Sequence, residues 1–196
     1  RQRQMCIRDS CLALAAQTPY VMEEEVRDSA ELCRRLGIRQ ETLAFPILPS
    51  LADNPPLRCY LCKHALFSAL AARAAEAGFP LLADGSNTDD LGDYRPGRKA
   101  LQELGILSPF LEAAMDKADI RSVARGLGLP ESVSGKPAYA CLATRIPTGE
   151  AITGEILARV EGEGLDIDRF LVITYTKAAA AELRGRICLL YTSPSP

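Results

Sequence analysis

Short apolar runs alternate with amphipathic helical patterns along most of this chain of 196 residues. Residues 11–16 and 39–48 have the composition of strands, whereas residues 23–36 and 63–77 repeat apolar side chains at helical spacing. Each of these helical patterns ends at a glycine, a common helix terminator. Strands joined through helices pair in parallel. The alternation therefore predicts an α/β protein with a mainly parallel sheet and flanking helices.

A polar loop follows a further apolar run at residues 79–83. Residues 84–97 are dense in Asp, Asn and Gly and also contain Tyr94 and Arg95. The carboxyl ends of strands are where open α/β sheets bind ligands. The loop therefore indicates a binding site, with an acidic solvated turn as the alternative. Short helices are expected after it, at residues 99–104 and 116–128.

Three cysteines form the strongest chemical signal in the chain. Cys59 and Cys62 make a C-x-x-C, and Cys141 lies far downstream in a segment that ends at Arg145. Three thiols can hold three corners of an iron–sulfur cube or three positions of a zinc tetrahedron, and they can also act as thiolates. A zinc knuckle and inert thiols remain open, since no fourth ligand is evident. His64 is the single histidine, which excludes a histidine-rich zinc site.

The composition limits where the chain works and what it binds. Hydrophobic residues make up 47% of the chain, charged residues 24%, and the net charge is -2. This balance favours neither nucleic acid nor a membrane surface, and no apolar run reaches the length of a membrane span. Without a secretory signal, seven cysteines favour a reducing compartment, so a cytoplasmic location is expected. The composition leaves a homo-oligomer open.

The two ends are expected not to belong to the natural protein. Residues 5–10 and 188–193 can be encoded by DNA stretches that are reverse complements of each other, a pattern that resembles sequencing-adapter DNA. We therefore expect residues 1–10 and 188–196 to be adapter-derived. Cys6 and Cys188 then leave the functional set, and five cysteines remain.

Four segments together resemble a known family. They are residues 58–63 (RCYLCK), 84–97 (DGSNTDDLGDYRPG), 108–109 (SP) and 141–145 (CLATR). In this order they closely resemble the LarE family of ATP-dependent sulfur transferases, of the PP-loop ATP pyrophosphatase superfamily. The resemblance runs over about residues 11–160. It implies an incomplete Rossmann-like sheet of the adenine nucleotide alpha hydrolase type, with flanking helices.

The resemblance implies a specific chemistry. ATP with Mg²⁺ adenylates a carboxylate of a pyridinium mononucleotide, a small-molecule substrate, and sulfur then displaces AMP to give a thiocarboxylate. Members with three cysteines hold a [4Fe-4S] cluster, so the resemblance implies Cys59, Cys62 and Cys141 as metal ligands and Cys141 as the catalytic position. It also suggests residues on the nucleotide and substrate side: Arg58, Asp84, Asn87, Asp90, Arg95 and Arg145.

Two features depart from the family pattern. The Ser-Gly-Gly-x-Asp-Ser loop that binds ATP is absent, together with the strand before it, so we expect no ATP hydrolysis by this chain. Residues 166–187 resemble a strand and helix of superfamily 1 DNA helicases. Residues 161–187 are therefore expected to be a foreign segment joined to the domain of residues 11–160. Two alternatives remain: a PP-loop tRNA-thiolating or amidotransferase relative, and a misassembled chimera without function.

Overall fold

The computed structural model describes residues 11–92, 96–136 and 140–162. The chain divides after Gly162 into two units, and everything described below lies in the first. The expected adapter-derived ends lie outside the described residues. So does the expected foreign segment of residues 161–187, apart from its first two residues, and its foreign origin therefore stays a prediction.

A parallel pair of strands forms the sheet, as the alternating pattern predicts. Strand β1 (Leu12–Gln17) pairs with β2 (Arg39–Ala44), with Leu12 opposite Arg39 and Gln17 opposite Ala44. β2 is shorter than the predicted residues 39–48, since Pro46 has no backbone N–H to continue the ladder. The run at residues 79–83 does not form a full strand either. Within the described ranges it contributes an isolated parallel bridge between Ala83 and Leu107.

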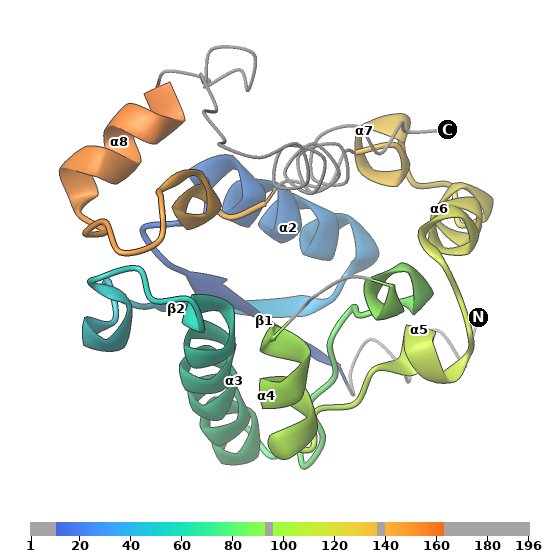
Figure 1. The fold of residues 1–196 in the computed structure, drawn as a ribbon. Helices are drawn as coiled ribbons and strands as arrows, with labels where there is room; N and C mark the ends of the chain where they lie inside the picture. The colour runs from blue at the N-terminus through green and yellow to red at the C-terminus, as the bar shows by residue number, and fades with distance from the viewer. Residues whose placement is uncertain (1–10, 93–95, 137–139, 163–196) are drawn as a thin grey trace. The chain divides into compact units, whose positions relative to one another are not determined.

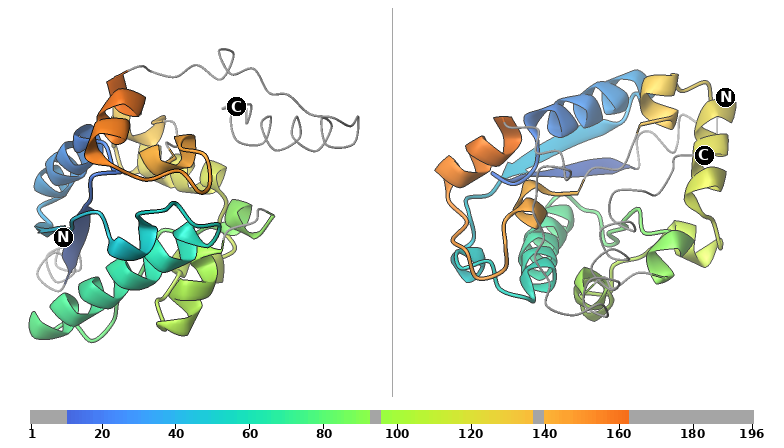
Figure 2. Two further views of the ribbon diagram at one scale, coloured as in Figure 1. Left: turned by 60° about the vertical axis from the view of Figure 1, so that its left-hand side comes forward. Right: turned by 45° about the horizontal axis from the view of Figure 1, so that its top comes forward.

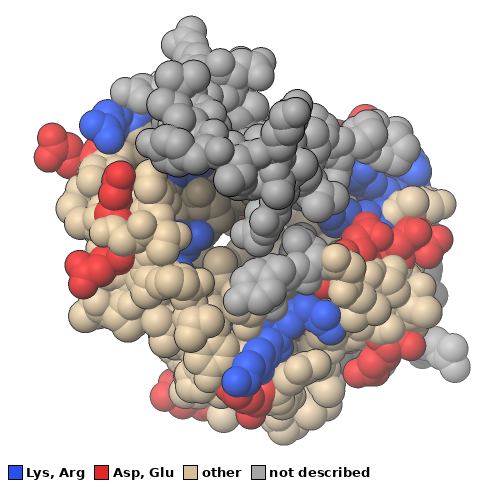
Figure 3. Space-filling view, in the orientation of Figure 1, with Lys and Arg blue, Asp and Glu red and all other residues tan. Residues whose placement is uncertain are grey.

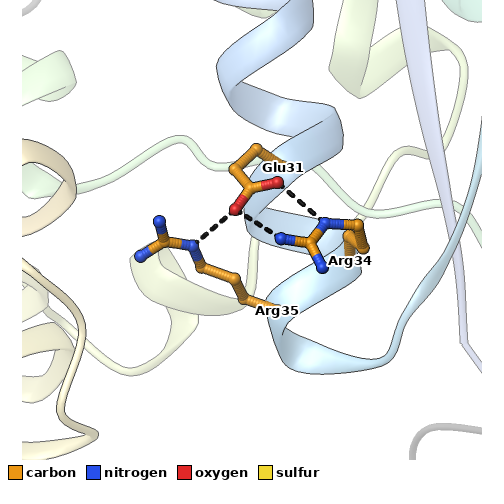
Figure 4. Close-up of polar contacts among 3 residues, drawn as sticks. All are labelled: Glu31, Arg34 and Arg35. Atoms are coloured by element: carbon orange, nitrogen blue, oxygen red, sulfur yellow. Dashed lines mark hydrogen bonds and ion pairs between the residues drawn. The ribbon is translucent and has the colours of Figure 1, made fainter.

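Helix α2 (Glu23–Leu36) connects the two strands and has the predicted bounds. Three glutamates occupy its first turn, and Arg34 and Arg35 lie in its last turn, which complements the helix dipole at both ends. Gly37 ends the helix in the left-handed region, at φ 68°. On the exposed side, Glu31 accepts hydrogen bonds from both arginines at 2.7–2.8 Å (Figure 4).

The two arginines lower the pKa of Glu31 to about 2, with hydrogen bonds from Arg34 and then Arg35 as the largest causes. Because this pKa is depressed from its ordinary value of 4.5, the ion pairs stabilise the fold above that value. The contribution is lost as the pH falls from there towards 2. An NMR titration of the Glu31 carboxyl should show this midpoint in the native chain. A midpoint near 4.5 would contradict the ion-pair geometry.

Helices cover both faces of the sheet, as Figures 1 and 2 show. α2 lies on one face, and α3 (Arg58–Glu76) with α4 (Gly97–Glu103) lies on the other. The remaining elements are η1 (Pro49–Leu51), η2 (Thr88–Leu91), α5 (Pro109–Glu112), α6 (Lys117–Gly126), α7 (Glu131–Ser134), η3 (Leu142–Arg145) and α8 (Gly154–Gly162). None of the helices in the described part of the chain has the length and apolar character needed to cross a bilayer.

A large share of the buried apolar side chains lies late in the chain. Leu142, Ile146 and Ile152 are 2–3% exposed, and so are Leu157 and Val160 of α8. Leu51 and Tyr20 join them from earlier segments. Burial of this kind fixes the segment that carries Cys141 against the start of α3, because each buried aliphatic side chain contributes roughly 1.5–3 kcal/mol.

Candidate functional site

The C-x-x-C lies on the first two turns of α3, not in a loop before it. α3 begins at Arg58, five residues before the predicted start at residue 63. The turn from Pro55, in which Arg58 N donates to the Pro55 carbonyl at 2.9 Å, leads directly into the helix. Cys59 and Cys62 are three residues apart, so they lie on one face of α3.

Asn54 connects the start of α3 to the segment after Cys141. Its side chain is fully buried, and its Nδ2 donates to the carbonyls of Ile146 and Pro147 at 2.8 and 2.7 Å. Its Oδ1 accepts a hydrogen bond from Arg58. Its own carbonyl accepts from Gly149 N at 3.1 Å. One side chain therefore brings together parts of the chain that are more than 90 residues apart.

Cys141 stands at the start of η3 and is held through its neighbours. Leu142 N donates to the Tyr20 carbonyl at 2.9 Å, which connects η3 to the residues after β1. Thr144 donates to the Cys141 carbonyl from both its N–H, at 2.9 Å, and its hydroxyl, at 2.7 Å. The short η3 turn therefore lies beside the start of α3, as Figure 2 shows.

The three thiols gather close enough to influence one another. Burial, followed by the neighbouring Cys141 and Cys59, raises the pKa of Cys62 to about 11. Burial also raises the pKa of Cys141, with Cys59 adding to the effect. Arg58 acts on both thiols in the opposite direction but does not overcome burial. Burial therefore favours the neutral thiols of Cys62 and Cys141, and a cation bound there would draw their protons off.

The described residues contain no group of three His, Cys, Asp or Glu side chains that could hold a metal ion. A mononuclear zinc site built on Cys59, Cys62 and Cys141 is therefore not formed. A cubane is larger than one ion and attaches each thiolate to a separate iron. The three thiols match such a group in number and in kind.

The polar loop after residue 83 is built largely on its own side chains. Asp84 accepts a hydrogen bond from the Ser108 hydroxyl at 2.6 Å and another from the Ser86 hydroxyl. Asn87 and Asp90 form a capping box that starts η2: Asn87 N donates to Asp90 Oδ2 at 3.0 Å, and Asp89 N donates to Asn87 Oδ1 at 3.2 Å. These interactions give the loop a fixed shape.

The other residues suggested by the family resemblance are placed differently. Arg95 lies outside the described residues. Arg145 donates to the carbonyl of Val160 in α8 at 3.4 Å. Gly97, which follows Arg95 in the motif, brings α4 very close to the cysteine helix. A Cβ at Gly97 would lie 2.7 Å from Lys63 Cδ and 3.2 Å from the Cys59 carbonyl oxygen.

A further set of contacts holds Lys136, five residues before Cys141, against α2. Lys136 Nζ pairs with Asp28 at 2.7 Å and with Glu25 at 2.8 Å, both on α2. These residues line a cavity of about 310 Å³ between α2 and the end of α7. On the face in Figure 3, acidic and basic side chains are interspersed and do not form one patch of a single sign.

The sequence analysis did not identify Tyr20 and Asn54 as residues of this site. Asn54 has a signal that could have been read: it precedes two prolines, and asparagine tolerates the left-handed region better than most residues. In the structure its φ is 45°. Tyr20 has no comparable signal, because only the fold shows that it lies against η3.

Comparison with known proteins identifies relatives of the chain. No family model matches it. It is 39% identical over 153 residues to an uncharacterized protein of Synechocystis sp., covering 77% of this chain and 56% of that protein. An uncharacterized protein of Methanocaldococcus jannaschii is 29% identical over 168 residues, which is 86% of this chain and 62% of that protein.

A third relative has a named activity. It is the pyridinium-3,5-bisthiocarboxylic acid mononucleotide synthase of Lactiplantibacillus plantarum, which is 32% identical over 155 residues. The match covers 78% of this chain and 55% of that protein. The chain thus spans little more than half the length of the curated relatives it matches.

Proposed function

We propose that this chain, which is homologous to the LarE-type pyridinium-3,5-bisthiocarboxylic acid mononucleotide synthase of Lactiplantibacillus plantarum, is part of a sulfur transferase. The observation that carries the proposal is the gathering of Cys59, Cys62 and Cys141 from two distant segments. A sulfur-handling centre of this kind requires its thiols to lie at one place, whereas inert thiols do not need to lie together. A cytoplasmic location suits free thiols of this kind.

The reaction proposed is substitution at an activated carboxyl carbon. The substrate is an acyl-adenylate of a pyridinium carboxylate mononucleotide. A sulfur nucleophile forms the new C–S bond, and the C–O bond to AMP breaks, with the electron pair leaving on the AMP phosphate. The product is a thiocarboxylate. Forming the adenylate requires ATP with Mg²⁺, and the Ser-Gly-Gly-x-Asp-Ser motif that would bind the ATP does not occur in this sequence.

The loop of residues 84–97 is proposed as the nucleotide side of the site, with Asp84, Asn87, Asp90 and Arg95 as its polar groups. The support is the fixed shape that Asp84 and the Asn87–Asp90 box give it, and the close approach of Gly97 to Cys59. Arg58 is proposed to face the sulfur side, because it interacts with two of the thiols. Arg145 is also proposed to act on the substrate side. This role requires that its hydrogen bond to the Val160 carbonyl breaks.

A [4Fe-4S] cluster is proposed as the sulfur carrier, with Cys59, Cys62 and Cys141 as its ligands. Such a cluster would supply an iron without a protein ligand, to which an exchangeable sulfur can bind. The chain's own residues hold the three thiols in position through Asn54 and η3. They keep the thiols half-buried, which limits the access of water and oxidants.

The direct test adds the acyl-adenylate itself, so the result does not depend on the ATP-binding motif that this sequence lacks. The full chain is incubated anaerobically with the synthetic acyl-adenylate and hydrosulfide, and thiocarboxylate is measured by mass spectrometry. We expect formation above the uncatalysed rate, and a fall to that rate for Cys141→Ala. Cys33→Ala is the matched control, since Cys33 lies on α2 and should leave the rate unchanged. A native chain with no advantage over buffer would refute the proposal.

A further inference from the structure

A cavity of about 200 Å³ lies between the polar loop, α4 and α5. Its polar lining comes from Ser86, Arg98, Gln102, Ser108 and Glu112, with aliphatic side chains such as Leu101 between them. Ser86 is 7% exposed and Leu101 is 3% exposed, so both belong to the inner wall. Binding sites for whole small molecules measure roughly 300–1,000 Å³. This cavity therefore takes one polar part of a ligand, not a complete nucleotide.

Two serine hydroxyls in the cavity wall are held by one carboxylate. Ser108 Oγ donates to Asp84 Oδ1 at 2.6 Å, and Ser86 Oγ donates to Asp84 Oδ2. A carboxylate only accepts hydrogen bonds and a hydroxyl has a single proton, so both protons are used on Asp84. Each hydroxyl can then offer only lone pairs to the cavity. Because they lie on the two oxygens of one carboxylate, the hydroxyls form a pair of neighbouring acceptors.

Arg98 adds a cation to the same cavity. It lies four residues before Gln102, so both side chains project from one face of α4. Arg98 Nη1 donates to the Asp90 carbonyl at 3.5 Å, which is longer than the usual distance of about 3 Å. Within the described ranges, no carboxylate forms an ion pair with Arg98. Its guanidinium is therefore available for an anion, and its planar fork suits a phosphate.

We propose that this cavity binds a ribose 5-phosphate group, with two sugar hydroxyls donating to Ser86 and Ser108 and the phosphate held by Arg98. The lining calls for two neighbouring donors and one anion, and a vicinal diol with a phosphate supplies them. The inference rests on the proposed function, whose mononucleotide substrate and AMP leaving group both contain this group. Arg98 directly follows Gly97, where α4 lies closest to the helix that bears Cys59.

The test is isothermal titration calorimetry of the full chain with ribose 5-phosphate, without ATP or iron. We expect saturable binding at one site. The matched probe is 2-deoxyribose 5-phosphate, which lacks one of the two hydroxyls and should bind about fivefold more weakly, the effect of one neutral hydrogen bond. Inorganic phosphate, which has no sugar, should bind more weakly still. Nicotinamide mononucleotide and AMP are titrated next, to identify which nucleotide supplies the group.

Two variants test the two ends of the ligand. Arg98→Gln should weaken ribose 5-phosphate at least tenfold, whereas Arg27→Gln, at an exposed position on α2, should bind like the native chain. Ser108→Ala should weaken ribose 5-phosphate about fivefold but leave the affinity for inorganic phosphate unchanged. If Ser108→Ala weakens both ligands alike, its hydroxyl only holds the loop in shape, and the proposal is overturned.

Three other results would overturn the site: no saturable binding of ribose 5-phosphate, equal affinities for ribose 5-phosphate and inorganic phosphate, or binding of neither nucleotide. A preference for nicotinamide mononucleotide or for AMP supports the site and identifies the source of the group. Failure of the sulfur-transfer function is a separate result, because it is judged by thiocarboxylate formation from the acyl-adenylate. A chain that forms thiocarboxylate but does not bind ribose 5-phosphate would keep the function and lose this site.

Discussion

Alanine at position 54 is expected to lower the free energy of unfolding by about 3 kcal/mol, a large fraction of the stability of a domain this size. The change removes both hydrogen bonds to the carbonyls of Ile146 and Pro147, which are buried or partly buried. It also leaves Arg58 without its acceptor. In addition, alanine is strained at a φ of 45°. Urea unfolding followed by circular dichroism measures the loss.

Two matched variants separate these causes. Asn54→Gly removes the same side-chain bonds but adopts a positive φ freely, so it should be less destabilised than Asn54→Ala by about 1 kcal/mol. Asn54→Asp keeps an acceptor for Arg58 and loses the donor to the two carbonyls. An Asn54→Ala chain as stable as the native one would show that this connection does not hold the segment of Cys141 in place.

Anaerobic reconstitution with iron and sulfide is expected to give the broad visible absorbance of a [4Fe-4S] cluster in the native chain. Changing any one of Cys59, Cys62 and Cys141 to alanine should remove most of it. A cluster with two thiolate ligands is much less stable than one with three, because each ligand fixes a separate iron. Iron and acid-labile sulfide per chain, measured after gel filtration, give the size of the loss.

Cys11 and Cys33 provide the controls, since neither takes part in the thiol cluster. Cys33 lies on α2, and burial raises its pKa, as expected for an inert thiol. Cys11 is exposed just before β1. Both alanine variants should load like the native chain. If they lose the cluster equally, or if Cys59, Cys62 and Cys141 are individually dispensable, the proposed ligand set is wrong.

Local signals predicted the first part of the fold well. α2 begins and ends where its periodicity and the glycine after it indicate, and β1 lies within one residue of the predicted run. The run at residues 79–83 shows the limit of such signals. An apolar run becomes a strand only where a neighbour pairs with it, and among the residues that the structure describes this run pairs through a single bridge, to Leu107.

The sequence predicted which cysteines make up the candidate site but not the contacts that bring them together. The sequence indicated the three cysteines, and the structure places their thiols within electrostatic reach of one another. It did not indicate that Cys59 lies inside α3, because a C-x-x-C after two prolines reads as a loop. Nor could it reveal the connections made by Asn54 and Tyr20. These depend on contacts between segments about 90 and 120 residues apart, which no local pattern encodes.

The contact at Gly97 has a consequence for how the two halves of the site work together. With only a hydrogen atom on that Cα, the backbone that follows the polar loop lies directly on the helix bearing Cys59. There is little space between them, so in the proposed reaction this contact would help to set the spacing from activated carboxyl to incoming sulfur. A methyl group at position 97 would displace the Lys63 side chain and press on the Cys59 carbonyl, while leaving every proposed reactive residue intact.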